Sequence, residues 1–141
     1  MDLQQLFLTM QKLPKGVIID NPHDLIYTNF KLPKEILSIL NTNNQKLMFT
    51  RLSIKHLAEK VIQGEYIINK INVIIAEPDS IHSGNFTNRF LVSKKIFFGI
   101  HQKNHIINIE ITKDKNNIIV TGFMARNSYF KNLKLFILFI S

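Results

Sequence analysis

Cysteine is absent from this chain of 141 residues. Its absence excludes disulfide bonds, thiolate nucleophiles and zinc sites built on thiolates. A chain without cysteine also fits a reducing compartment, and the N-terminus lacks the basic start, apolar run and small-residue cleavage site of a secretory signal. We therefore expect a cytoplasmic protein.

Long hydrophobic runs are missing as well. The apolar run at residues 135–140, Leu-Phe-Ile-Leu-Phe-Ile, is too short to span a bilayer. We interpret it as a buried final strand, with an interfacial anchor as the alternative, and we expect no stable membrane insertion.

Several catalytic motifs are also absent. The sequence contains no P-loop, no GxGxxG, no HExxH and no serine elbow. These absences exclude most nucleoside triphosphatases, dinucleotide-binding enzymes, zinc proteases and α/β-hydrolases. The pair His101 and His105 has an i, i+4 spacing, but both flank an expected turn at residues 102–104, so we interpret them as solvated loop histidines. No cofactor and no metal site is expected.

Positive charge is abundant. Eighteen lysine and arginine residues against ten aspartate and glutamate residues give a formal net charge of +8. This balance favours a polyanionic partner, either nucleic acid or an anionic membrane surface. Hydrophobic residues make up 45% of the chain, which is enough for one globular domain over residues 1–141.

The residue pattern of the first half of the chain predicts mainly helices. Residues 1–16 are expected to be a short helix or a loose arm, residues 17–19 a short strand, and residues 33–40 a short helix. The best-marked helix covers residues 53–63, with Ser53 as N-cap and Gly64 as the stop. Residues 66–76 favour a further helix, although their β-branched side chains are also typical of a strand.

The second half reads as strands at residues 89–94, 96–101, 106–112 and 118–124, after a loop at 81–88. For the last hairpin, a four-residue loop at 114–117 would pair Lys113 with Ile118. Ile107, Ile109 and Ile111 would then share the core face with Ile118, Val120 and Met124. On the other face Thr121 would lie opposite Glu110, beside Asn108 and Thr112. The sequence therefore predicts a polar sheet face.

His56 falls outside the apolar arc of the 53–63 helix, and Lys60 lies one turn further along the same polar side. RNA cleavage needs a general base, a general acid and cations for the phosphorane charge. Side chains of these types are His56, Lys60, Arg89, Lys94, Glu110 and Thr121. Each has an ordinary structural alternative: solvated surface charges, a pairing of Arg89 with Glu77 or Asp79, and for Tyr129 a core-edge aromatic instead of a base-stacking platform.

The chain resembles the barnase–EndoU–colicin E5/D–RelE-like nucleases, in particular their phage- and mobile-element-borne branch. The similarity covers about residues 32–135, which would be the nuclease-like core, with residues 1–30 as the arm. It rests on the order of five segments: Pro-Lys-Glu-Ile-Leu (33–37), Leu-Ser-Ile-Lys-His-Leu-Ala-Glu-Lys (52–60), Pro-Asp-Ser-Ile (78–81), Asn-Arg-Phe-Leu-Val-Ser-Lys (88–94) and Ile-Ile-Val-Thr-Gly-Phe (118–123) followed by Tyr-Phe-Lys-Asn-Leu (129–133).

This resemblance implies an α+β fold, with N-terminal helices followed by an antiparallel sheet of four to five strands. It implies a metal-independent endoribonuclease that cleaves RNA by 2′-hydroxyl transesterification. His56 would transfer protons, Arg89 and Lys94 would hold phosphate, and Thr121 would hydrogen-bond it; Lys60, Glu110 and Tyr129 are secondary candidates. RNA is the expected partner, and a toxin-type ribonuclease would add an inhibitor protein. The alternatives are a non-catalytic RNA-binding module on the same fold and a structural or peripheral membrane protein.

Overall fold

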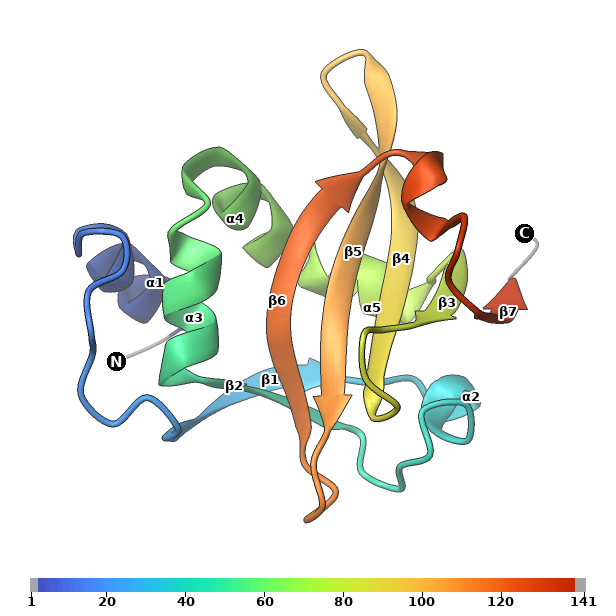
Figure 1. Cartoon of the computed structure of the whole chain (residues 1–141), viewed down its shortest axis with the longest axis horizontal. Helices are drawn as coiled ribbons and strands as arrows, with labels where there is room; N and C mark the ends of the chain where they lie inside the picture. Colours follow the sequence, from blue (N-terminus) through green and yellow to red (C-terminus); the bar gives the residue numbers. More distant parts are fainter. Residues whose placement is uncertain (1–2, 139–141) are drawn as a thin grey trace.

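The computed structural model describes residues 3–138, apart from the side chains of residues 61 and 62. These residues form an α+β fold with five α-helices, one 3-10 helix and one seven-stranded mixed sheet (Figure 1). In chain order the elements are α1 (Leu3–Gln11), β1 (Leu25–Lys31), α2 (Lys34–Leu37), β2 (Lys46–Thr50), α3 (Arg51–Ala58), α4 (Val61–Ile68), α5 (Ile71–Ala76), β3 (Ser80–Ser83), β4 (Arg89–Phe98), β5 (His101–Ile111), β6 (Asn117–Ala125), η1 (Asn127–Phe130) and β7 (Leu135–Leu138).

The sheet is larger than the sequence predicts. Its order is β1-β2-β6-β5-β4-β3-β7, and all neighbours are antiparallel except β2 and β6, which run parallel. The expectation of four to five antiparallel strands is therefore wrong. The parallel contact is reinforced by Asn117, whose buried side-chain amide donates to the backbone oxygens of Asn44 and Lys46.

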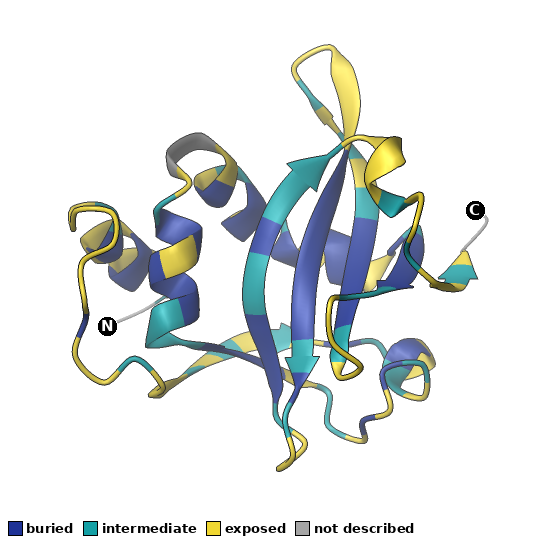
Figure 2. Cartoon of the chain, in the orientation of Figure 1, coloured by how far each residue is buried: buried dark blue, intermediate teal, exposed yellow. Residues whose placement is uncertain are grey.

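One face of this sheet is closed by the helices. Figure 1 shows α1, α3 and α4 grouped beside β6, and α5 behind β4 and β5. The main core joins apolar side chains of these helices to alternate residues of the strands, among them Ile54, Leu57, Phe49, Ile107 and Ile109, all of which are fully buried. Figure 2 shows the same buried zone along β5 and α3.

The N-terminal segment contributes to this core. Residues 3–11 form a helix, and Leu6, Phe7 and Met10 are buried in the main cluster. The helix alternative for the segment is therefore confirmed for these residues. The strand expected at residues 17–19 is wrong, because Ile18 is 96% exposed and the segment has no ladder partner.

The predicted 53–63 helix is two helices. Thr50 at the end of β2 caps α3, where Ser53 completes a capping box, so Ser53 is not the N-cap. The helical conformation is interrupted at Lys60, whose φ of −92° and ψ of 82° are not helical, and α4 begins at the next residue. Gly64 lies inside α4, where a Cβ atom would come within 2.0 Å of the Leu57 carbonyl oxygen. It permits the close approach of two helices and does not end one.

Helical structure is confirmed for residues 66–76, but as the end of α4 and the whole of α5. The short 33–40 helix is present as α2, followed by a turn. None of the helices in the described residues is long and apolar enough to cross a bilayer.

The register predicted for the β5–β6 hairpin is wrong. The structure pairs Glu110 with Ile118 and, beyond a bulge, Asn108 with Thr121. Thr121 therefore does not lie opposite Glu110. Because of this shifted pairing, Ile119 joins the main core, whereas Ile118 lines a cavity on the other face together with Val120. The bulge adds a residue to β6 and returns Met124 to the core side, so the core face predicted for β6 holds only for Met124.

Residues 80–101 also differ from expectation. The expected loop at 81–88 begins with β3. The strand expected at 89–94 continues to Phe98 as one β4, and the strand expected at 96–101 is interrupted by the turn at residues 99 and 100. His101 and His105 both belong to β5, so the turn expected at 102–104 is wrong. His101 is exposed as predicted, but His105 is fully buried.

The C-terminal run forms β7, an edge strand paired with β3. It is a strand as predicted, but it is not buried, because Leu135 and Leu138 are 47% and 58% exposed. Residues 139 and 140 of the predicted run lie outside the described part. Just before β7, the 3-10 helix covers part of the open sheet face, where Phe130 stacks on His82 with ring centroids 4.2 Å apart.

Candidate functional site

A cavity of about 390 Å³ opens where the start of α3 meets the uncovered face of the sheet. Its walls come from five separate places in the sequence: the loop before β1, the β2–α3 junction, and the facing ends of β4, β5 and β6. The polar lining residues are His23, Thr50, Ser53, His56, Arg89, Glu110 and Thr112, and the apolar ones are Leu25, Leu52, Ile118 and Val120. We call this cavity the α3 cleft.

The α3 side of the cleft is held by a rigid helix start. The Thr50 hydroxyl accepts a hydrogen bond from the Ser53 amide at 3.0 Å, and the Ser53 hydroxyl accepts one from the Thr50 amide at 2.8 Å. Such reciprocal bonds satisfy two backbone donors that would otherwise lack partners. His56 follows three residues after Ser53 and is exposed into the cleft, while its neighbours Ile54 and Leu57 are buried in the core.

The sheet side of the cleft carries an ion pair. Arg89 and Glu110 are direct partners across β4 and β5, and the Arg89 guanidinium lies 3.2 Å from the Glu110 carboxylate. The two side chains are 25% and 29% exposed, so solvent screens the pair and its contribution to stability is small, about 0–1 kcal/mol. The Arg89 guanidinium also lies 4.8 Å from the centre of the Phe86 ring. This arrangement fixes a cation at the cleft wall without burying it.

A second cavity of about 360 Å³ adjoins the first. It is lined by Lys15, His56, Glu59, Lys60, Val120 and Thr121. His56 and Val120 line both cavities, so His56 lies at their common wall. A ligand longer than one cavity would therefore pass directly by the imidazole.

The Lys60 side chain contacts β6 in this second cavity. Its ammonium lies 3.3 Å from the Thr121 hydroxyl and 3.4 Å from the Gly122 carbonyl oxygen, and 5.3 Å from the centre of the Phe123 ring. Loss of hydration lowers the pKa of Lys60 from its ordinary value. None of the ion pairs among the described residues includes Lys60.

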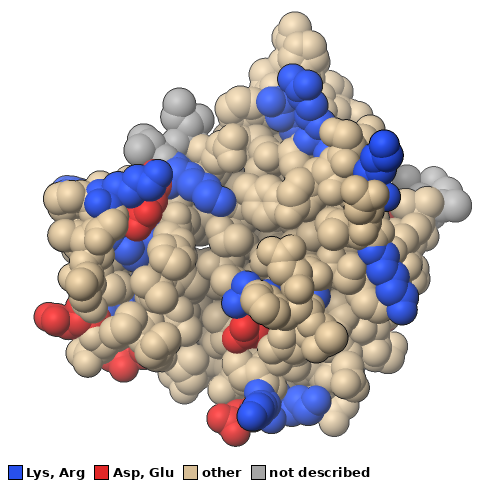
Figure 3. All heavy atoms as spheres, viewed as in Figure 1, with Lys and Arg blue, Asp and Glu red and all other residues tan. Residues whose placement is uncertain are grey.

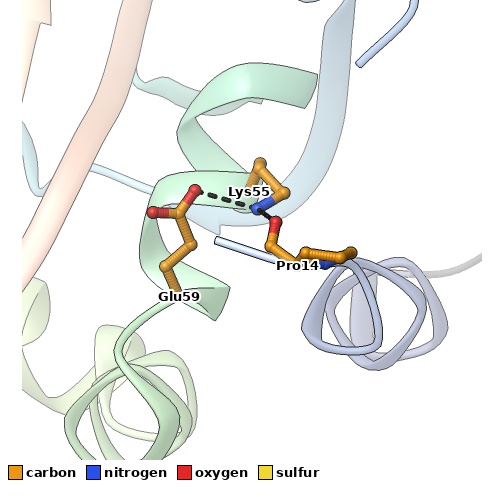
Figure 4. Close-up of polar contacts among 3 residues, drawn as sticks. All are labelled: Pro14, Lys55 and Glu59. Atoms are coloured by element: carbon orange, nitrogen blue, oxygen red, sulfur yellow. Dashed lines mark hydrogen bonds and ion pairs between the residues drawn. The ribbon is translucent and has the colours of Figure 1, made fainter. Parts of the chain in front are cut away.

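Lys55 connects α3 to Pro14, which lies three residues after the end of α1. Its side chain is 1% exposed, and its ammonium donates to the Glu59 carboxylate at 2.9 Å and to the Pro14 carbonyl oxygen at 3.1 Å (Figure 4). The hydrogen bond from Lys55 lowers the pKa of Glu59. Because Lys55 immediately precedes His56, this buried contact also restrains the helix turn that presents the imidazole.

The structure brings together five of the seven predicted site residues. His56, Arg89 and Glu110 line the α3 cleft, and Lys60 and Thr121 join His56 in the adjoining cavity.

Lys94 does not belong to this group. Side chains alternate along β4, so Lys94 points to the face opposite Arg89, and its ammonium donates to the Glu77 carbonyl oxygen at 2.7 Å, at the end of α5. Tyr129 belongs to η1, away from both cavities. Its ring lies edge-on to Phe123 at 5.1 Å and to Phe130 at 5.8 Å, but it is 44% exposed and outside the main core, so the interpretation as a core-edge aromatic is not supported.

His23 is the one cleft residue of chemical interest that sequence reasoning missed. It precedes β1, is exposed, and lines the cleft together with His56. A histidine between Pro22 and Asp24 has no pattern of its own. The pairing of β1 with β2 brings it to α3, together with backbone hydrogen bonds from the Arg51 and Leu52 amides to the carbonyl oxygens of Asp24 and Pro22, and neither strand was predicted.

Positive charge is not concentrated at the cleft. Figure 3 shows lysine and arginine side chains on this face in several separate groups, some beside acidic side chains. Within the described residues, no group of three or more His, Asp or Glu side chains is placed to hold a metal ion.

Comparisons with known proteins do not assign the chain to a family. No family model matches it, and searches of curated proteins and of solved structures give no significant match.

Proposed function

We propose that this protein is an endoribonuclease whose active site is the α3 cleft. One observation carries the proposal: five distant parts of the sequence place two histidines, an arginine and a carboxylate in one cavity of about 390 Å³. The resemblance to the barnase–EndoU–colicin E5/D–RelE-like nucleases supports the same reaction class. RNA is the proposed substrate.

The proposed chemistry uses the ribose 2′-hydroxyl as nucleophile. One group removes its proton as the oxygen attacks the phosphorus, and a second group protonates the departing 5′-oxygen, which leaves a 2′,3′-cyclic phosphate. Histidine suits both roles because its ordinary pKa lies near neutral pH. His56 and His23 are the two such groups in the cleft.

Arg89 would bind the phosphate, because a guanidinium presents two parallel donors to phosphate oxygens. Glu110 would position Arg89 through the ion pair at 3.2 Å. The cation of Lys60 and the hydroxyl of Thr121 would bind the next phosphate along the strand, because their cavity shares the wall formed by His56. Lys94 and Tyr129 have no part in this proposal.

The test is incubation of total RNA with the wild type, His56→Ala and a control variant in EDTA, followed by analysis of the new ends. Loss of a proton-transfer group lowers such rates by about 10²–10⁴-fold. We expect the wild type to produce 2′,3′-cyclic phosphate ends, and His56→Ala to be slower by this factor at unchanged thermal stability. Lys113→Ala, an exposed substitution in the β5–β6 turn, is the control. Equal cleavage by wild type and His56→Ala would remove the proposal.

A second candidate is RNA binding without cleavage. It is favoured by one observation, the ion pair of Arg89 with Glu110, which engages the cation that the cleavage reaction would use, so that phosphate binding would rest on Lys60, which joins no ion pair among the described residues. The two candidates are distinguished by products: the binding module retains RNA in a salt-sensitive way and leaves it intact. Should a toxin-type role apply, an inhibitor protein would act by covering the cleft.

A further inference from the structure

The β4–β5 hairpin extends beyond the body of the molecule. Its strands stay paired from Arg89 with Glu110 to Phe98 with His101, and Figure 1 shows its end as the most distant projection of the sheet. The turn residues are Gly99 and Ile100. Gly99 has a φ of +67°, which suits the first position of a two-residue hairpin turn, and no atom lies within 4 Å of the position its Cβ would take. The end of the hairpin is therefore free of contacts on that side.

The tip of this projection is apolar. Phe97 is 59% exposed and Ile100 is 86% exposed. Single exposed apolar residues are ordinary on a protein surface. Two of them at the end of one hairpin form a small apolar patch. Tyr66 of α4 contacts the hairpin here, since its hydroxyl donates to the Phe97 carbonyl oxygen at 2.8 Å and its ring lies 5.0 Å from that of Phe98, but the side chains of Phe97 and Ile100 stay exposed. Figure 2 shows the end of the hairpin as exposed.

A basic collar lies directly behind the tip. Lys95 and Lys103 are exposed, and the alternation of side chains places them on opposite faces of the hairpin. From residue 94 to residue 109 the chain has three lysines, two histidines and no acidic residue. The nearest acidic contact is Asp79, which accepts a hydrogen bond from the Lys95 amide. Figure 3 shows basic atoms just below the tip of the projection, and none at its end.

We propose that the β4–β5 hairpin is a peripheral membrane contact that binds the surface of an anionic lipid bilayer. Ile100 and Phe97 would enter the boundary between headgroups and acyl chains. Lys95 and Lys103 would then lie at the level of the lipid phosphates. The two parts act together, since apolar insertion and attraction to anionic lipid add in such interfacial segments.

A lipid surface fits this hairpin better than RNA does. RNA-binding surfaces without sequence preference combine a basic groove with aromatic platforms. Here the most exposed apolar side chain is the aliphatic Ile100. The cavity of about 610 Å³ that Lys95 and Gln102 line lies at the base of the hairpin, also carries Asp79, and does not include Phe97 or Ile100. The hairpin also lies at the opposite end of β4 and β5 from Arg89 and Glu110. The proposal therefore does not depend on the proposed cleavage of RNA.

The experiment is flotation of the full chain with vesicles of phosphatidylcholine alone and with added phosphatidylglycerol. We expect binding only to vesicles that contain phosphatidylglycerol. The double variant Phe97→Ser/Ile100→Ser should lower the partition coefficient by about tenfold or more, because it removes two large apolar side chains from the interface. Lys95→Gln/Lys103→Gln should lower it by a similar factor, since each lysine near an anionic surface contributes about fivefold.

The matched control is Ile18→Ser/Lys113→Gln, which removes one exposed apolar and one exposed basic side chain elsewhere on the surface. We expect it to bind vesicles like the wild type. Absence of flotation, or equal losses in the control and in the hairpin variants, would overturn the proposal. So would hairpin variants that keep vesicle binding but lose RNA binding in a parallel filter assay, because the hairpin would then be an RNA contact.

Discussion

The two faces of the sheet give a polar side chain different surroundings. The face covered by the helices forms the main apolar core, and side chains such as Ile107, Ile109 and Phe49 are fully buried there. The uncovered face carries the ion pair of Arg89 and Glu110 beside a cavity. A polar side chain costs free energy on the first face unless it finds a partner, whereas on the second it meets water or a ligand. The comparison shows that the main core and the proposed active site lie on opposite sides of the same strands.

The largest expected difference concerns truncation on the two faces. Ile107→Ala removes a fully buried side chain from the main core, and such changes cost about 2–5 kcal/mol. Thr121→Val on the uncovered face keeps the shape of a half-exposed side chain and should stay within about 0.5 kcal/mol. Urea denaturation of both variants gives the two free energies of unfolding. Similar values for the two variants would break the comparison.

A smaller effect is expected at Gly122, which follows Thr121 but faces α4. A Cβ atom there would lie 2.5 Å from a methyl carbon of Ile67, so Gly122→Ala overpacks the contact and should cost about 1–3 kcal/mol. In the background Ile67→Ala, where that methyl group is absent, the same substitution should cost much less. A double-mutant cycle measures the difference, and a coupling energy near zero would contradict this account of the helix–sheet contact.

The smallest effect, per pH unit, concerns His105 on the covered face. Burial is the main cause that lowers its pKa, and its Nε2 has no hydrogen-bond partner. The unfolded chain binds the proton more readily, so the stabilisation is complete above the ordinary histidine pKa of about 6.5 and is lost as pH falls below it. One such group contributes a slope of at most about 1.4 kcal/mol per pH unit.

The pKa of His82, on the uncovered face, is also lowered by burial. The pH dependence of stability should therefore decrease, without disappearing, in His105→Leu. This is measured by urea denaturation at a series of pH values. An unchanged slope in His105→Leu would contradict the role of His105.

Much of the α+β character could be predicted from local pattern, because α3 has clear helical periodicity and β6 alternates after a run of turn residues. The seven-stranded sheet could not. β1 alternates exposed with half-buried residues and has no buried one, and β2 pairs with β6 through a contact about 70 residues away in sequence. The turn of the β5–β6 hairpin covers residues 112–116, because Ile111 pairs with Asn117, and this shift moved Thr121 away from Glu110. The bulge beside Ile119, which leaves no signal in composition, returns Thr121 to the face of Glu110.

The candidate site was predictable to the extent that helix geometry governs it. His56 could be placed on the polar side of a helix from spacing alone, and it lines the cleft. Arg89 and Lys94 lie five residues apart in the strand expected at 89–94, so the alternation of side chains already places them on opposite faces. Which of the two faces is the uncovered one depends on the whole sheet and could not be predicted. His23 required the long-range pairing of β1 and could not be found.

The most direct test of the central claim compares Arg89→Ala with Lys94→Ala. Both substitutions remove a cation from β4, but Arg89 lines the α3 cleft and Lys94 donates to Glu77 on the opposite face. In the RNA cleavage assay in EDTA, we expect Arg89→Ala to lose about 10²-fold or more in rate, as for a group that stabilises transition-state charge, and Lys94→Ala to cleave like the wild type. Equal rates for the two variants, or a loss confined to Lys94→Ala, would contradict the assignment of the chemistry to the uncovered face.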